Sequence, residues 1–351
     1  MAAMQVISVN APHDVQFIER EIKQPGLGEV LVKVMSAGIC GTDADIISGD
    51  LIYFKNGMAS MPIVPGHEWS GQIVECGPGV RNFAVGDRVT GECTVACGHC
   101  KYCVEGYTNM CINRTETGVM NRDGGYAEYI TFPVTSLHQC NGLEYDTGAC
   151  VEPACIAMSA IKRSGITPRD NVLVIGPGPI GLMAAQIVKK IYHANKVILS
   201  GTRDDRLARA SGYGLDGIIN VRRENLPEKV RDSTRGEMID VVIEAAGAPS
   251  SFTDMEKILN PAGRISLLSF FGSKEVKCNW DFISTNSITV YGSLGSPGVW
   301  PFVIAKLESC DIEVDSIISH RLPLKSREDF LNAFYLMEER RDNVCKVILH
   351  P

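Results

Sequence analysis

Short apolar runs and alternating apolar and polar positions predict β-strands through the first half of the chain. Residues 29–34 have the pattern of a half-buried strand, and residues 71–76 form a second such run that ends in the turn Gly77-Pro-Gly79. A third strand is expected to begin in residues 86–89. No segment recurs at a fixed period, so the pattern excludes a solenoid of stacked repeats.

The pattern changes near Ala154, where a helix-like stretch runs through Ile161 and ends at Gly165. Beyond it, strands are predicted at 172–175, 197–200, 218–220, 241–244, 265–268 and 288–291, with helices at 180–190, 206–211 and 252–259. Strands that alternate with helices are typical of a doubly wound parallel sheet. After Gly292 the alternation stops. The tail has one amphipathic helix near 329–340, and we expect it to return to the first domain because it is too small to bury its own core.

Length and composition narrow the classes of protein that fit. A chain of 351 residues is too long for one ordinary core and predicts two domains, and its 45% hydrophobic and 21% charged residues speak against disorder. The net charge of -7 argues against a nucleic-acid or anionic-membrane surface. No apolar run is long enough to span a bilayer, and the N-terminus has no signal-peptide pattern. We therefore expect a cytoplasmic protein.

A glycine run, Gly176-Pro-Gly178-Pro179-Ile180-Gly181, lies between the first strand and the first helix of the alternating region. In a dinucleotide-binding turn the first glycine permits the tight turn, the second lets the backbone approach the pyrophosphate, and the third allows close helix–sheet packing. The helix N-terminus then presents unpaired N–H groups to the phosphates. A purely structural turn is the alternative, but the strand–turn–helix–strand context favours a dinucleotide site.

The end of the second strand bears on the choice of dinucleotide. An NAD site places an acidic residue about 20 positions past the last glycine to hold the ribose 2′-hydroxyl. Here that position is Gly201, followed by Thr202 and Arg203. Arg203 could bind a 2′-phosphate with two hydrogen bonds, so the residues favour NADP. The alternative is that Arg203 is a solvated loop residue and that Asp204 or Asp205 reaches the ribose.

Four of the thirteen cysteines stand close together and predict a closed zinc site: Cys97, Cys100, Cys103 and Cys111. Their lobe, about residues 92–112, is too hydrophilic to be held together by burial, so zinc would supply the missing folding energy. Unmetallated thiols or a redox pair are the alternative. His99 lies between the ligands, but four thiolates already fill a tetrahedron.

A second, more dispersed set lies upstream and predicts an open zinc site. Cys40 follows a strand-like segment, and His67-Glu68 follows Val64-Pro65-Gly66. A single cysteine or histidine is more often a core or turn residue than a ligand. The neighbouring closed site and the hydride-carrier fold downstream raise the odds of ligation, and together these features predict a zinc-dependent oxidoreductase.

The chain resembles the zinc-containing medium-chain dehydrogenase/reductase family over essentially its whole length. Within that family it is more similar to the sorbitol, polyol and threonine dehydrogenase branch than to the liver alcohol dehydrogenase branch. The motifs that carry the resemblance are the cysteine quartet, the glycine turn, Gly38-Ile-Cys40-Gly-Thr42-Asp43, Pro65-Gly66-His67-Glu68, Gly86-Asp87-Arg88-Val89 and Val151-Glu152-Pro153. The family implies an α/β protein with a GroES-like, mainly-β catalytic domain at 1–153 and 294–351. A Rossmann dinucleotide-binding domain at 154–293 interrupts it.

The resemblance also implies roles for single residues. Cys40 and His67 are expected to bind a catalytic zinc, with Glu68 and Glu152 sharing the remaining protein positions and the state of the site deciding which of them binds directly. Thr42 matches the hydroxyl that hydrogen-bonds the substrate oxygen and takes its proton. Asp45 stands where many relatives have a histidine proton relay. It could serve as the relay, or it could simply cap the following helix.

The expected activity is hydride transfer between a secondary alcohol and NAD(P), with two zinc ions per chain. The branch favours a sugar alcohol, cyclitol, aminocyclitol or sugar acid as substrate, with a threonine-type amino alcohol next. A non-enzymatic NAD(P)-binding protein on the same fold is the rival. Tyr53 and Phe54 could line the substrate pocket or merely pack a surface loop. Relatives are commonly dimers or tetramers, so a homo-oligomer is expected, with the sheet edge at 288–291 as a contact.

Overall fold

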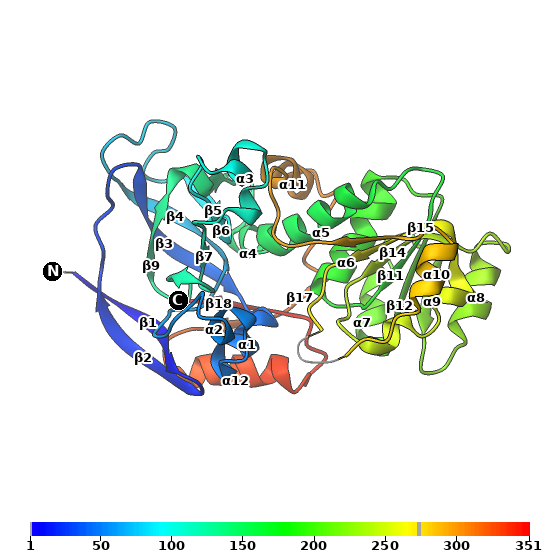
Figure 1. Cartoon of the computed structure of the whole chain (residues 1–351). Coiled ribbons are helices and arrows are strands. Elements are labelled where there is room, and N and C mark those ends of the chain that lie inside the picture. Colours follow the sequence, from blue (N-terminus) through cyan, green and yellow to red (C-terminus); the bar gives the residue numbers. More distant parts are fainter. Residues whose placement is uncertain (1, 272–274) are drawn as a thin grey trace. The chain divides into compact units, whose positions relative to one another are not determined.

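The computed structural model describes residues 2–271 and 275–351. The chain divides into two compact units (Figure 1). The first comprises Met1–Glu152, Trp300–Glu308 and Ile318–Pro351, and the second comprises Pro153–Val299 and Ser309–Ile317. The chain thus leaves the first unit and returns to it twice. No helix within 2–271 and 275–351 is long and apolar enough to cross a membrane.

The first unit is built on a seven-stranded mixed sheet. Its strands follow the order β10 (Leu137–Gln139), β5 (Arg88–Gly91), β4 (Glu68–Cys76), β3 (Glu29–Gly38), β18 (Lys346–His350) and β17 (Ile318–Pro323), with β9 (Tyr129–Pro133) also pairing with β3. A hairpin of β1 (Ala3–Ala11) and β2 (Asp14–Glu21) and a small sheet of β6 (Thr94–Val95), β7 (Thr115–Thr117) and β8 (Asn121–Arg122) complete the β-structure. The predicted strands at 29–34, 71–76 and 86–89 correspond to β3, β4 and β5.

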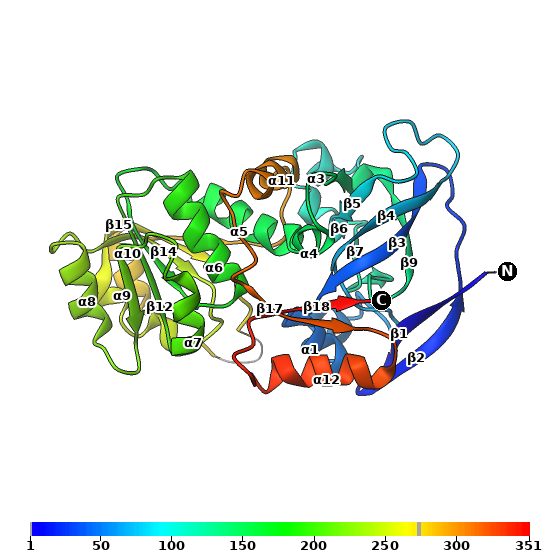
Figure 2. The same cartoon turned by 180° about the vertical axis from the view of Figure 1, so that it is seen from behind.

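Short helices connect these strands, and one longer helix packs on them. The helices of this unit are α1 (Thr42–Ser48), α2 (Ile52–Lys55), α3 (Lys101–Val104), α4 (Tyr145–Ala149), α11 (Trp300–Glu308) and α12 (Arg327–Glu338), with 3₁₀ turns at Thr108–Met110 and Val134–Ser136. The predicted tail helix is α12, which lies against β2, β17 and β18 (Figure 2). Its N-cap Ser326 accepts a hydrogen bond from the Asp329 N–H at 3.1 Å, which starts the helix.

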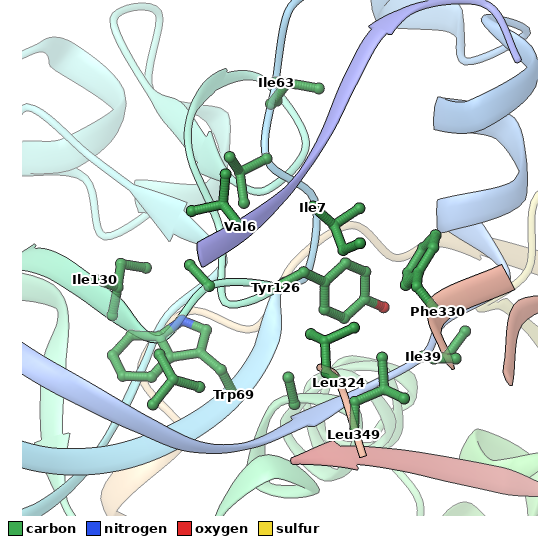
Figure 3. Close-up of a cluster of buried hydrophobic side chains, with 14 of the residues drawn as sticks. Val6, Ile7, Ile39, Ile63, Trp69, Tyr126, Ile130, Leu324, Phe330 and Leu349 are labelled. Carbon is green, nitrogen blue, oxygen red and sulfur yellow. The ribbon is translucent and has the colours of Figure 1, made fainter. Parts of the chain in front are cut away.

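Aromatic side chains hold the core of the first unit together. Figure 3 shows the Tyr126 ring among Ile7, Leu349 and Phe330. The Tyr126 and Phe330 ring centroids are 5.2 Å apart, and an edge-on pair of Trp69 with another buried ring adds a second contact. Each such side chain contributes about 1.5–3 kcal/mol by burial. This core fixes the strands whose ends carry the site described below.

The second unit is a six-stranded, all-parallel sheet with helices packed on it. The strand order is β13 (Gly217–Asn220), β12 (Lys196–Gly201), β11 (Asn171–Ile175), β14 (Ile239–Glu244), β15 (Leu259–Leu267) and β16 (Thr289–Gly292). This is the strand order of a Rossmann fold, so the predicted doubly wound sheet is confirmed. The helices of the second half are α5 (Val151–Ser164), α6 (Pro179–Gln186), α7 (Asp204–Leu207), α8 (Leu226–Ser233), α9 (Met255–Ile258) and α10 (Trp280–Thr285), and shorter turns lie at Ile187–Ile191, Ala208–Ala210 and Pro249–Phe252.

One predicted helix was wrong in extent, and one helix of the tail was missed. The helix predicted over 252–259 shrinks to α9, because Leu259 pairs with Ile239 and opens strand β15. In the tail, α11 was not predicted. Its buried residues have the spacing i, i+3, i+4, i+7, which is a helical signal that the sequence does contain: Trp300, Val303, Ile304 and Leu307.

Candidate functional site

Strand pairing explains why two ligand segments far apart in the sequence meet. Strands β3 and β4 are antiparallel, and Gly38 at the end of β3 pairs with Glu68 at the start of β4. The residue that follows β3 therefore emerges beside the residue that precedes β4. Cys40 is the second residue past β3, and His67 directly precedes β4, so the sheet brings the two segments together.

Glycines make this junction possible. A Cβ atom on Gly38 would overlap the carboxylate of Glu68. Gly66 has a φ of +98°, and a Cβ there would lie 2.9 Å from the Tyr126 backbone nitrogen. Any side chain at either position would displace the segment that carries His67.

The junction gathers a metal-ligating set. The ligand atoms of Cys40, His67 and Glu68 all lie within 4.8 Å of one another. His67 Nδ1 is buried and has no hydrogen-bond partner among the residues that the structure describes. A buried nitrogen without a partner costs free energy unless something binds it. A cysteine thiolate, a histidine nitrogen and a carboxylate are ligands that zinc accepts, so these residues fit a zinc ion.

The charge around His67 favours a cation. Burial alone would lower the pKa of His67, but the negative charges of Cys40, Asp43 and Glu152 raise this pKa well above its usual range. Burial, with Glu68 adding repulsion, raises the pKa of Glu152 to about 7. Glu152 lies in the first turn of α5 and is buried, outside the three-residue set but within its electrostatic field. The centre thus carries an excess of negative charge, which a bound zinc ion would offset.

Asp43 supports Cys40 from behind, a role that the sequence did not reveal. Its carboxylate accepts the Cys40 N–H at 2.9 Å and the Tyr126 hydroxyl at 2.5 Å. Tyr126 also donates to the Gly38 carbonyl, and its ring is locked in the core shown in Figure 3. The aromatic core therefore sets the position of the Cys40 backbone.

Lys346 is a second residue that the sequence did not reveal. Its side chain is only 2% exposed, forms an ion pair with the buried Glu68, and donates to the Ile39 carbonyl at 2.9 Å. Burial opposes the charge of Lys346, but the carboxylate of Glu68 holds its pKa above the usual range. Because Glu68 is ion-paired with Lys346, Glu152 is the carboxylate more available to bind a metal ion.

Replacing Lys346 with methionine should lower the free energy of unfolding by about 3–5 kcal/mol, because Glu68 would remain buried without its partner. Urea denaturation of the zinc-loaded protein measures the change. Lys346→Arg, which keeps the charge, is the control and should lose less. A methionine variant as stable as the parent would show that Glu68 does not depend on Lys346.

Thr42 and Asp45 both lie in the first turn of α1. The Cys40 thiol donates a long hydrogen bond to the Thr42 hydroxyl at 3.8 Å, so Thr42 stands beside the ligand set. Asp45 is exposed and three residues further along the same helix face. The alternative that Asp45 caps a helix is wrong: it lies inside α1, and the N-caps of α1 and α2 are Gly41 and Leu51.

The four lobe cysteines form a compact cluster. Their sulfur atoms lie within 4.8 Å of one another, with Cys97–Cys103 at 4.0 Å and Cys100–Cys103 at 3.5 Å. Sulfur atoms about 2.3 Å from a tetrahedral zinc ion would be about 3.8 Å apart, so the spacing fits. The His99 N–H lowers the pKa of Cys97 to about 6, whereas burial and the neighbouring thiols raise the pKa of Cys103 to about 12. A zinc ion bound among the four sulfur atoms would offset the negative charge of their thiolates.

The glycine turn has the stereochemistry that a dinucleotide site needs. Gly176 has a φ of +105°, and a Cβ there would lie 2.9 Å from the Ala245 carbonyl. A Cβ on Gly181 would overlap the Gly176 carbonyl, whereas one on Gly178 would meet nothing within 4 Å. The space next to Gly178 is therefore open to a ligand at the N-terminus of α6, which begins at Pro179 and Ile180.

At the end of β12, the two aspartates that could reach a ribose are engaged by other side chains. A Cβ on Gly201 would overlap the Pro177 ring, so that position cannot take an acidic side chain. Asp204 accepts from Asn220 at 2.5 Å and pairs with a neighbouring arginine. Asp205 accepts two hydrogen bonds from Arg203, at 3.0 and 2.6 Å. One Arg203 nitrogen, Nη1, is buried without a partner in the described part of the chain. Thr202 beside it is exposed.

Comparisons with known proteins agree with this geometry. Residues 26–142 match the family model of the alcohol dehydrogenase GroES-like domain, and residues 179–309 match that of the zinc-binding dehydrogenases. The sorbitol dehydrogenase of Halalkalibacterium halodurans is 32% identical over 338 residues, which cover 95% of this chain and 94% of that protein. This chain belongs to the zinc-containing medium-chain dehydrogenase/reductase family. It is an oxidoreductase of the polyol and threonine dehydrogenase-like branch and acts on CH–OH groups.

Two solved structures place this dehydrogenase among cofactor-binding relatives. The RspB alcohol dehydrogenase of Escherichia coli CFT073, complexed with NADH, has a TM-score of 0.90 and 32% identity over the whole of both chains. A zinc-binding dehydrogenase of Sinorhizobium meliloti 1021, bound to NADP, has a TM-score of 0.91 and 27% identity, again over both whole chains. One of these relatives was thus solved with NADH and the other with NADP.

Proposed function

We propose that this dehydrogenase oxidises a secondary alcohol on a polyhydroxylated carbon chain or ring, with NADP as hydride acceptor and two zinc ions per chain. The observation that carries the proposal is the cluster of half-buried Cys40 with buried His67 and Glu68, on which the charge of Glu152 also acts. In the proposed arrangement Cys40, His67 and Glu152 bind the catalytic zinc, whereas Glu68 stays ion-paired with Lys346. The lobe cysteines hold the second ion. We further propose a cytoplasmic homo-oligomer.

The residues around Cys40 suggest how the proton leaves. A zinc ion bound there would act as a Lewis acid that lowers the pKa of the substrate hydroxyl. Thr42 accepts the hydroxyl proton, and Asp45, one helical turn away and exposed, passes it to water. With NADP bound at the glycine turn, the nicotinamide would accept hydride from the alcohol carbon, so that the products would be a ketone, NADPH and one proton.

A substrate panel tests this function. The zinc-loaded protein would be assayed by nicotinamide absorbance with sugar alcohols, cyclitols, amino alcohols and simple secondary alcohols, with NAD and NADP in parallel. We expect the highest kcat/KM with a polyol or cyclitol and NADP. A clear preference for threonine-type amino alcohols would replace the polyol proposal, and activity unaffected by removal of zinc would refute the metal's role.

We infer the NADP preference from Arg203. Gly201 has no room for a carboxylate, and Asp204 and Asp205 are both engaged by other side chains. Among the residues that the structure describes, Nη1 of Arg203 lacks a partner. A 2′-phosphate would supply acceptors for this guanidinium.

Arg203→Ala should weaken NADP binding by about 1.5–3 kcal/mol, the scale of a hydrogen bond to a charged group, with little effect on NAD. Fluorescence titration with each reduced cofactor measures the change. Arg169→Ala, at an exposed position of the same unit, is the control. Equal losses for both cofactors, or a parent protein that prefers NAD, would show that Arg203 does not bind the 2′-phosphate.

A further inference from the structure

Tyr53, Arg114 and Glu116, none of which is a predicted zinc ligand, form a polar cluster in the first unit. Glu116 is on β7 and is only 6% exposed. Its Oε1 accepts from Arg114 Nε at 2.8 Å and from the Tyr53 hydroxyl at 3.3 Å. Arg114 also donates to the Cys111 carbonyl at 3.3 Å, and its guanidinium lies 5.8 Å from the centre of the Tyr53 ring. A carboxylate that is nearly buried and held by two donors has a fixed orientation.

Backbone contacts place β7 against the catalytic ligand loop. Glu116 pairs with Thr94 of β6, and the next residue, Thr117, donates its N–H to the Cys93 carbonyl at 2.7 Å. The backbone of Gly118 packs so closely on Gly66 that a Cβ there would lie 2.7 Å from the Gly66 nitrogen. Gly66 directly precedes His67. The strand that carries Glu116 therefore runs alongside the segment that carries a zinc ligand.

The charge of Glu116 reaches the metal centre. Burial is the main cause of the raised pKa values of Glu152 and Cys93, and the carboxylate of Glu116 raises both further. Cys93 is also under the influence of Cys40 and Glu68. Glu116 thus acts electrostatically on Glu152 and Cys93, although it does not belong to the ligand set.

Glu116 keeps one unused acceptor. The Arg114 and Tyr53 donors both bind Oε1. Among the described residues no donor binds Oε2, and this oxygen is not fully buried. Arg114 neutralises the carboxylate, so the cluster carries no net charge. A neutral cluster with an open acceptor suits an uncharged hydroxyl donor better than an anion. An aliphatic chain would leave the acceptor unpaired.

We propose that Glu116, oriented by Arg114 and Tyr53, is a specificity-determining residue that accepts a hydrogen bond from a second hydroxyl group of the substrate. The enzyme then selects polyhydroxylated alcohols over simple ones. This inference rests on the proposed function, in which the adjacent centre oxidises the first hydroxyl.

Paired substrates and matched variants test this role. Zinc-loaded parent protein, Glu116→Leu and Glu116→Gln would be assayed with xylitol, sorbitol and ribitol and with 2-butanol, which has one hydroxyl. For Glu116→Leu we expect KM for the best polyol to rise about tenfold or more, with KM for 2-butanol changed by less than about twofold. Tyr53→Phe should raise KM for the polyol by a smaller factor, again with little change in KM for 2-butanol. Glu105→Gln, an exposed change in the zinc lobe, is the control. Zinc content is measured for every variant.

The outcomes separate this inference from the proposed function. If the parent oxidises polyols but Glu116→Leu and Glu116→Gln impair polyol and 2-butanol equally, Glu116 only anchors the structure and the inference falls while the function stands. If KM for the polyol is unchanged in both variants, the inference is refuted while the proposed function stands. If the parent oxidises no polyol with either cofactor, the proposed function fails and the inference fails with it.

Discussion

Cys40→Ala should lower kcat by about 10³-fold or more, because the several kcal/mol of transition-state stabilisation from a Lewis-acid zinc would be lost. The affinity for the dinucleotide should stay the same. Cys40 follows β3 in the first unit, whereas the glycine turn follows β11 in the second, so the change leaves the cofactor segment intact.

Three measurements make this result decisive: kcat with the best alcohol, zinc per chain, and cofactor affinity by fluorescence titration. Cys278→Ala, the same chemical change at an exposed cysteine of the second unit, is the control and should behave like the parent protein. A Cys40→Ala protein that has lost its exchangeable zinc and still turns over would refute the Lewis-acid mechanism.

Freshly prepared protein should contain two zinc ions per chain, and loss of the one in the cysteine lobe should have the larger effect on stability. Structural zinc contributes about 10 kcal/mol of binding free energy in small sites, and here that energy is coupled to the folding of residues 92–112. Cys100→Ser should therefore remove one tightly bound zinc and expose the lobe to proteolysis. The chelator that strips the open site should leave the closed one loaded.

His99→Ala is the matched comparison for the lobe. His99 lies between the ligand cysteines, is exposed, and contacts the Cys97 carbonyl through Nδ1 at 2.8 Å. If the four thiolates alone hold the ion, this variant keeps its zinc and its resistance to protease. Loss of zinc on His99→Ala, or a Cys100→Ser protein with an intact lobe, would contradict the four-thiolate site.

Elements that depend on neighbours in the sequence were predictable. The quartet spans fifteen positions, from Cys97 to Cys111, and its spacing alone indicated a shared ion. The glycine turn was recognisable because φ > 0 at Gly176 and the packing of Gly181 are demands of the local chain. The alternating strands of the second unit were predicted for the same reason, since the hydrophobic period is a local property.

Other features depended on contacts between distant segments and could not be predicted in this way. Short elements such as α9 depended on the strand pairing of Leu259, which outweighed a helical pattern. Asp204 and Asp205 could not be assigned from the sequence, because only the folded loop shows which cation each one faces. The capping alternative for Asp45 was wrong because helix boundaries are the least certain part of a sequence-based prediction.

The sequence by itself determined the family of chemistry. The closed thiolate site and the dinucleotide turn each consist of residues close together along the chain, and the open metal site was indicated by separate short motifs. Only the tertiary structure decided how the open site is assembled and what surrounds it. The β3–β4 register brings Cys40 to His67, and strand β18, more than 270 residues beyond Glu68, delivers Lys346 to it. Burial then sets the charges of these groups. Register and burial are properties of the whole fold, so no local pattern of residues could have revealed them.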